Sequence, residues 1–363
     1  MTLKSLRRSP RPWALALAAA GVLILVAAGT LSVQFYLWAA MPYRGHGSSS
    51  VIVEVPPGAG LRQTLAILQA HGIVRPFKLD ALYLRMTGRG RGIKAGEFDF
   101  TRPMTPAEVF DKIINGDVYH HRITILEGMR SDEVFAMFER SGFGTREEFI
   151  EAFQDTAPVA GIDDAAVDLE GYLFPDTYSL PKGTPARAVV EMMVARFREV
   201  FRPEWGERAK AHGMTVREAV TLASLIERET VIAEENPIVS SVFHNRLREG
   251  MRLQCDPTVI YALAMRDQYD GNIRKADLMI DSPYNTYRYA GLTPGPIGNP
   301  GASALQAAVA PADTGYLYFV SMNTGRHHFS ETLEEHNRAV WEYQKRPFRL
   351  KRLARSGGAK RGS

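Results

Sequence analysis

Glu227 is the residue whose type and position could do chemistry, in the stretch TLASLIERET at 221–230. At 100° per helical residue, Val220 and Ala223 lie within about 40° of Glu227, whereas Glu229 falls almost opposite. A carboxylic acid on an apolar helix face has a raised pKa and tends to stay protonated, which suits a general acid. Helix geometry alone leaves open a structural glutamate, partly exposed or paired with a nearby arginine.

The sequence shows no motif for other common site chemistries. Its histidines, which include the His120-His121 and His327-His328 pairs, do not have a metal-ligand spacing such as HExxH. It has no G-x-S-x-G, no P-loop and no dinucleotide fingerprint. We therefore expect neither a metal nor a cofactor.

Two segments are rich in aromatic and turn residues and suit carbohydrate. We expect an exposed, structured loop at 168–184 (DLEGYLFPDTYSLPKGT). The segment 281–301 has four prolines and four glycines, which predicts a rigid irregular wall. Aromatic faces stack on sugar rings, and glycoside cleavage commonly needs an acid to protonate the leaving oxygen.

The N-terminal region predicts export and anchoring. The segment from Pro12 to Tyr43 has no charged residue, and its apolar part is long enough to span a membrane. Four basic and no acidic residues precede it, so residues 1–11 should be cytoplasmic, 12–34 a transmembrane helix and the rest exported. A cleaved signal peptide is the alternative, because Ala39-Ala40 resembles a cleavage site.

Charge and cysteine content limit the remaining classes of function. The net charge is +4, but the first 12 residues carry four basic groups and 345–361 carry eight, which leaves −8 in between. The high pI therefore does not predict nucleic-acid binding. The single cysteine, Cys255, allows no intramolecular disulfide. We expect the basic tail, 345–363, to be disordered.

The chain is expected to fold as α+β, with a small domain before a larger one. After a short linker, a strand, a turn glycine and a helix ended by glycine occur twice, at 51–73 and 122–143. Such βα modules resemble LysM-like domains that bind wall glycans, with an ordinary α+β unit as the alternative. We place a LysM-like domain at 45–118 and a catalytic domain at 119–344.

Several long motifs together resemble the endolytic murein transglycosylase family. They are ILEGMRSDEV, EGYLFPDTY, ASLIERET, SVFHNRLREGMRLQCDPTVIYAL, SPYNTYRYAGLTPGPIGNPG, AAVAPADTGYLYFV and HHFSETLEEHN. The resemblance covers roughly residues 50–340 in order, with the membrane anchor where that family has it. Cys255 departs slightly, since the family more often has a small hydroxyl residue there.

The resemblance implies a single-pass protein of the inner membrane whose catalytic domain is periplasmic. Members cleave the β-1,4 bond after N-acetylmuramic acid in nascent peptidoglycan, leave 1,6-anhydro ends and end strand elongation near the synthases (penicillin-binding proteins). The family's catalytic glutamate corresponds to Glu227. Glu227 would be the only catalytic carboxyl, first as acid and then as base for the muramic C6 hydroxyl.

Other residues are candidates for positioning the sugar or orienting Glu227. They are Gln254, Asp256, Tyr284, Asn285, Tyr287 and Glu170, the last of which could instead be structural. Two rival functions remain open at this stage. One is a wall-binding scaffold without catalysis, and the other is a hydrolase that uses water, with Asp256 or Glu170 as second carboxylate.

Overall fold

The computed structural model of this protein describes residues 12–347. The expected cytoplasmic segment 1–11 and nearly all of the basic tail lie outside these residues. The chain divides into two compact units. One contains the residues up to His121 together with 180–182, and the other contains 122–179 and the residues from 183 onward.

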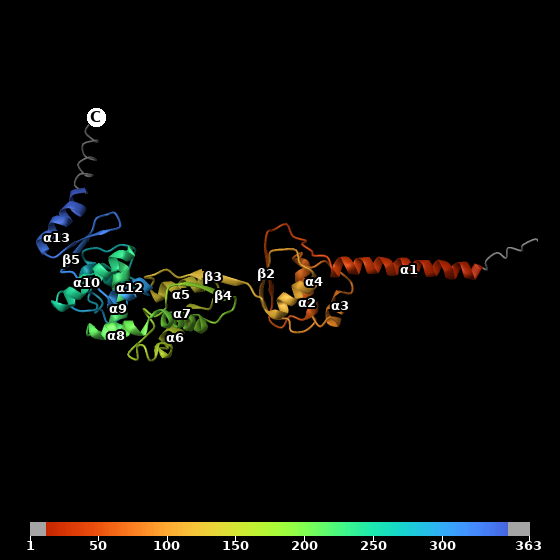
Figure 1. Cartoon of the computed structure of the whole chain (residues 1–363), viewed down its shortest axis with the longest axis horizontal. Helices are drawn as coiled ribbons and strands as arrows, with labels where there is room; N and C mark the ends of the chain where they lie inside the picture. The colour runs from red at the N-terminus through yellow and green to blue at the C-terminus, as the bar shows by residue number, and fades with distance from the viewer. Residues whose placement is uncertain (1–11, 348–363) are drawn as a thin grey trace, which may run out of the picture. The chain divides into compact units, whose positions relative to one another are not determined.

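The first described element is the long apolar helix α1 (Pro12–Ala39), at the red end of the chain in Figure 1. Within Trp13–Ala39, an 18-residue window has a mean hydropathy of 2.4 and is not buried inside the protein, so the helix is long and apolar enough to cross a membrane. The helix continues five residues beyond the expected span. Near its end, the Trp38 ring stacks on Phe77 at 5.4 Å and is buried.

The rest of the first unit is a strand–helix–helix–strand arrangement followed by another helix. Its elements are β1 (Val51–Val55), α2 (Leu61–Ala70), α3 (Asp80–Met86), β2 (Gly96–Phe100) and α4 (Pro106–Asn115). Strands β1 and β2 pair antiparallel, with Val53 opposite Phe98. Both of these side chains are fully buried in the unit's core. Helix α4 begins at a capping box that Thr105 and Glu108 form.

The second unit is mostly helical and has two short sheets. Strand β3 (His120–Thr124) pairs with β4 (Thr177–Pro181), and β5 (Tyr318–Ser321) forms an antiparallel pair with β6 (His327–Ser330). Its α-helices are α5 (Ser131–Arg140), α6 (Arg146–Gln154), α7 (Ala186–Val200), α8 (Pro203–Ala211), α9 (Val216–Glu229), α10 (Asn236–Arg248), α11 (Asp256–Ala264), α12 (Ala302–Val309) and α13 (Leu333–Val340). Helix and strand therefore mix in one chain, as the sequence predicts.

Helix α9 is the centre of the second unit. It packs against α8, α10, α11 and α12. The labelled helices α8, α9, α10 and α12 lie close together in Figure 1. The residues at 219–226 are all buried. An α-helix that is buried on every side belongs to the core of a domain, and it does not have the single apolar stripe expected from its sequence.

The segment 281–301 has no helix or strand, as expected for its glycines and prolines. The segment 168–184 is different from the prediction of an exposed loop. Its residues 169–175 are buried, and the chain then continues into β4. The aromatic side chains that suggested a sugar-facing loop are used for packing: the Tyr172 ring, for example, lies 5.0 Å from the ring of Phe197.

Candidate active site

Glu227 lies in the last turn of α9, at the end of a well-defined helix. The Thr215 hydroxyl accepts a hydrogen bond from the Glu218 backbone N–H at 3.1 Å, and the Glu218 carboxylate accepts one from Thr215 N–H at 2.8 Å. This capping box fixes where α9 begins, and hence which side chains its last turn presents. Glu227 is half-buried, so its carboxyl group is partly removed from water but still accessible.

The Glu227 carboxyl group is held by the backbone of a distant loop. The Gly301 N–H, immediately before α12, donates to Glu227 Oε2 at 2.9 Å. The pKa of Glu227 is raised to about 7, and burial is the main cause. The charge of Glu127 also raises this pKa, whereas the hydrogen bond from Gly301 lowers it. A group whose pKa lies near neutrality can both donate and accept a proton at physiological pH.

Glu127 is a second carboxylate at this site that the sequence analysis did not single out. A Cβ atom on Gly301 would overlap the Glu127 carboxylate, so Gly301 lies against Glu127 while its N–H binds Glu227. Glu127 is exposed, in the ILEGMRSDEV motif just after β3. The neighbouring carboxylate is therefore neither Asp256 nor Glu170, the two candidates weighed for a second carboxyl group.

Asn299 joins the three loops that build the site. Its buried side-chain carbonyl accepts the N–H groups of Gly171 and Leu173 at 3.1 and 2.9 Å, and its amide N–H donates to Met129 O at 2.9 Å. Its backbone also exchanges hydrogen bonds with 128–129, at 2.8 and 2.9 Å. The loops that carry Glu127 and Gly301 are thus fixed to one another.

Asn299→Ala is expected to destabilise the protein by at least about 2 kcal/mol. The buried N–H groups of Gly171 and Leu173 would lose their partner, and each unsatisfied group costs about 1–3 kcal/mol. Urea unfolding of both proteins measures the difference. The control is Asn272→Ala, in an exposed loop. A loss from Asn299→Ala no larger than that of the control would contradict the assigned role of this amide.

Arg228 and Gly128 also lie beside Glu227. Arg228 Nη1 donates to Gly128 O at 2.9 Å, and Gly128 has a φ of +77°. A Cβ on Gly128 would lie 3.5 Å from Glu227 Cγ, so the loop backbone passes close to the acid. A hollow of about 550 Å³ opens here, lined in part by Glu127 and Arg228.

Glu170 is buried and bound to structural groups. Its carboxyl group accepts hydrogen bonds from Ser131 N–H at 3.1 Å, from the Ser131 hydroxyl at 3.0 Å and from the Tyr261 hydroxyl at 3.3 Å. Burial raises its pKa to about 8. These contacts connect the N-terminus of α5 to α11, so they favour the structural alternative for Glu170.

Asp256 and Tyr287 act electrostatically on Glu229 or are acted on by it, and the nearby Gln254 N–H donates to Thr286 O at 3.2 Å. The Tyr287 hydroxyl donates to the exposed Asp256 carboxylate, and burial, Asp256 and the charge of Glu229 raise the pKa of Tyr287. Gln254 is exposed and has a φ of +50°, which is uncommon for a residue other than glycine. Burial also raises the pKa of Glu229, which is next to the Cys255 thiol. Burial therefore raises the pKa of both glutamates in the last turn of α9, Glu227 and Glu229.

Tyr284 and Asn285 have different environments although they are adjacent. The Tyr284 ring is half-buried and lies 4.8 Å from the ring of Tyr261. Asn285 is fully buried, and its amide donates to Leu278 O and Ile280 O at 3.0 and 2.8 Å. The Asn285 amide therefore holds its own loop together and is not available to a ligand.

No three His, Cys, Asp or Glu side chains are grouped for metal binding within residues 12–347. What the site does contain is a half-buried glutamic acid with a pKa near neutrality, a backbone N–H on its carboxyl group and a second carboxylate nearby. These features define an acid–base centre on a helical α+β unit.

Comparison with known proteins identifies the family. The chain belongs to the YceG-like family, whose profile matches residues 53–342. The endolytic murein transglycosylase of Bacillus subtilis (strain 168) is 30% identical over 319 residues, which cover 83% of this chain and 87% of that protein. That of Streptococcus pneumoniae serotype 2 is 28% identical and matches 88% of this chain and 63% of its own length.

A solved structure supports the same relationship. The crystal structure of a YceG-like protein from Listeria monocytogenes matches 80% of this chain and 98% of its own, with a TM-score of 0.54 and 30% identity. The family match therefore extends into both units of the chain, and Glu127, Glu227 and Gly301 lie within the matched range.

Proposed function

We propose that this protein is an endolytic peptidoglycan transglycosylase, a lyase that cuts glycan strands internally. The relatives that carry this name support the substrate class and the reaction. The observation that carries the proposal for this chain is Glu227, half-buried, hydrogen-bonded to Gly301 N–H and with a pKa of about 7. Close to half of the molecules then hold the proton at neutral pH.

The proposed reaction needs only one group that first gives and then takes a proton. Protonated Glu227 donates to the oxygen that links N-acetylmuramic acid to the next N-acetylglucosamine, and the bond from C1 to this oxygen breaks. The muramic C6 hydroxyl then attacks C1, and Glu227 takes its proton. The product ends in 1,6-anhydro-N-acetylmuramic acid, and no water is consumed. The negative charge of Glu127 would stabilise the positive charge that develops at C1.

Digestion of purified sacculi and nascent glycan tests the proposal. The products are separated and their ends are determined by mass spectrometry. Anhydro-muramyl ends from internal cuts are expected. Reducing ends would indicate the rival hydrolase, and an absence of cleavage would indicate the rival scaffold.

We further propose that α1 anchors the protein in the inner membrane as a single span, with the second unit in the periplasm. The exposed apolar length of α1 supports an anchor, and the basic residues before it support a cytoplasmic N-terminus. Cutting strands as they emerge would end their elongation, which places peptidoglycan synthases among the proposed partners. A reporter fused after residue 50 should be periplasmic, and a cytoplasmic reporter would refute this topology.

The first unit is proposed to be LysM-like and to bind glycan. The order β1, α2, α3, β2, with the two strands paired antiparallel, supports this proposal. The full-length Glu227→Gln variant, which should not cleave, is mixed with insoluble peptidoglycan and sedimented. Its binding would separate glycan binding from cleavage. Failure of such a variant to sediment with peptidoglycan would argue against it.

A further inference from the structure

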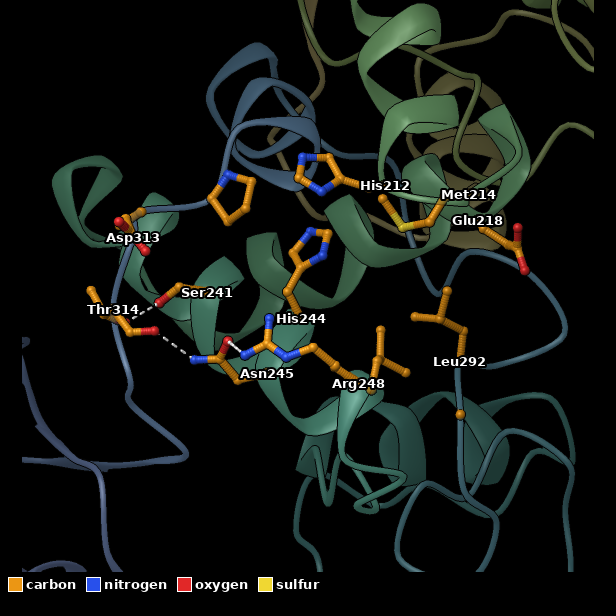
Figure 2. A pocket seen from close by; sticks show the side chains of 14 residues that line it. His212, Met214, Glu218, Ser241, His244, Asn245, Arg248, Leu292, Asp313 and Thr314 are labelled. Atoms are coloured by element: carbon orange, nitrogen blue, oxygen red, sulfur yellow. Dashed lines mark hydrogen bonds between the residues drawn. The ribbon is translucent and has the colours of Figure 1, made fainter.

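The second unit has a pocket of about 810 Å³, with both polar and apolar lining residues, that does not include Glu227 (Figure 2). One face of α10 forms a wall of this pocket. The rest is formed by the end of α8, the first turn of α9 and two loops, at 291–292 and 311–314. The α10 side chains on this face follow the helical spacing i, i+3, i+4, i+7 and are Ser241, His244, Asn245 and Arg248.

Hydrogen bonds make the floor of the pocket rigid. The Ser241 hydroxyl is 2.7 Å from that of Thr314, and the Asn245 amide donates to Thr314 O and Tyr316 O at 2.8 and 2.9 Å. Asn245 and Ser241 are buried. A pocket whose walls are fixed in this way does not have to be ordered when a ligand binds, so less entropy is lost.

The pocket brings three groups that are or can become cationic close together. The rings of His212 and His244 have their centres 5.0 Å apart, are tilted by 52° and lie next to each other in Figure 2. His244 Nε2 donates to Ala308 O at 2.8 Å, which leaves Nδ1 for a ligand. Arg248 donates to Asn245 Oδ1 at 2.7 Å and has no ion pair with any residue at 12–347.

None of these three groups forms an ion pair with a carboxylate within residues 12–347, although two carboxylates line the pocket. Burial lowers the pKa of His244, and the charges of His212 and Arg248 lower it further. Of the two acidic residues of the pocket, Glu218 is used in the capping box with Thr215. The other, Asp313, is exposed on the loop at 311–314. A bound anion would offset the repulsion that the charges of His212 and Arg248 exert on the protonated form of His244.

We propose that this pocket binds a carboxylate of the peptide stem on the glycan strand, through Arg248 and the two histidines. Asp313 would accept an ammonium group of the same stem. This inference rests on the proposed function, because it takes peptidoglycan as the substrate. Stem peptides carry free carboxylates and an amine, and the pocket offers groups of both complementary signs.

The distance along α9 suits such a ligand. Glu218, which lines the pocket, is nine residues before Glu227 on the same helix, or about 13.5 Å along its axis. An extended peptide of four residues spans about 13–14 Å. The separation along the helix axis is thus close to the length of an extended stem, and binding of a stem in the pocket would favour strands that still carry stems.

The first test compares glycan strands that carry stems with strands from which an amidase has removed them. For the full-length variant Arg248→Gln, the ratio of kcat/KM on stem-bearing to stem-free strands should fall about tenfold, as for the loss of one charge-assisted hydrogen bond. The matched control is Arg326→Gln, at an exposed arginine outside the pocket. An unchanged ratio, including an equal loss on both substrates, would overturn the proposal.

A binding measurement keeps the inference separate from the proposed function. The ring resonances of His244 are followed by NMR while the full-length Glu227→Gln variant is titrated with a synthetic stem tetrapeptide. The peptide should raise the pKa of His244, because a carboxylate stabilises the charged ring. No change in this pKa, or an equal change with inorganic phosphate, would overturn the assignment to stems even if the protein cuts glycan. If the peptide raises the pKa of His244 but the parent enzyme cuts neither the stem-bearing nor the stem-free strands, the proposed function is refuted and the assignment of the pocket stands.

Discussion

Replacing Glu227 with glutamine is expected to reduce the formation of anhydro-muramyl ends by at least about 10³-fold. Proton transfer by a positioned acid or base contributes about 10²–10⁴-fold, and Glu227 is proposed to act in both directions. Glutamine keeps the shape of the side chain but has no proton to donate at neutral pH. Mass spectrometry of the ends, after equal times of digestion, measures the loss.

The parent enzyme should also lose activity as the pH rises. Free enzyme must hold the proton on Glu227, whose pKa burial raises to about 7. The value of kcat/KM should therefore be constant below about pH 6 and fall about tenfold for each unit well above pH 7. For the Glu227→Gln variant, the matched control is Glu207→Gln, at a glutamate that is exposed on α8. Parental cleavage rates in Glu227→Gln would refute the assignment of the acid.

The substitution Glu227→Gln should also stabilise the fold at alkaline pH. The pKa of Glu227 is about 7 in the folded protein and near its ordinary value of 4.5 when unfolded. The folded state then binds more protons between these values, so its stability falls as the pH rises from about 4.5 to 7. Glutamine removes this dependence. The Tm of Glu227→Gln should exceed that of the parent by more at pH 8 than at pH 5, and a constant difference would contradict the raised pKa.

Replacing Glu127 with glutamine is expected to move the descending limb of the pH profile to lower pH. The charge of Glu127 helps to raise the pKa of Glu227, and both carboxyl groups adjoin Gly301. Without this charge, Glu227 releases its proton more easily. The fraction of protonated enzyme at pH 8 then falls, by up to tenfold for each unit by which the pKa decreases.

A full pH profile separates this effect from a simple loss of structure. Misfolding would scale kcat/KM equally at every pH, whereas removal of the charge shifts the limb. The control is Glu147→Gln, at an exposed glutamate in the first turn of α6 whose charge does not act on Glu227. A limb that stays in place in Glu127→Gln would show that Glu127 does not act on the proton of Glu227.

Features that depend on local chemistry can be predicted from the amino-acid sequence alone. The uncharged run of α1, the capping boxes that begin α4 and α9 and the irregular chain at 281–301 can be read from neighbouring residues. The family motifs, together with an acid on a helix, were enough to single out Glu227. Each of these features depends on residues within a few positions of one another, so sequence spacing describes them well.

Which side chains lie beside Glu227, and which are used for packing, becomes visible in the tertiary structure. Glu127, Glu227 and Gly301 come from loops and a helix that are about a hundred and seventy residues apart at their extremes, and Asn299 fixes their meeting. Asn285 and Glu170 looked like sugar contacts but are buried with their hydrogen bonds satisfied inside the protein. Sequence could not settle these cases, because a buried polar group is defined by partners that folding brings from elsewhere in the chain.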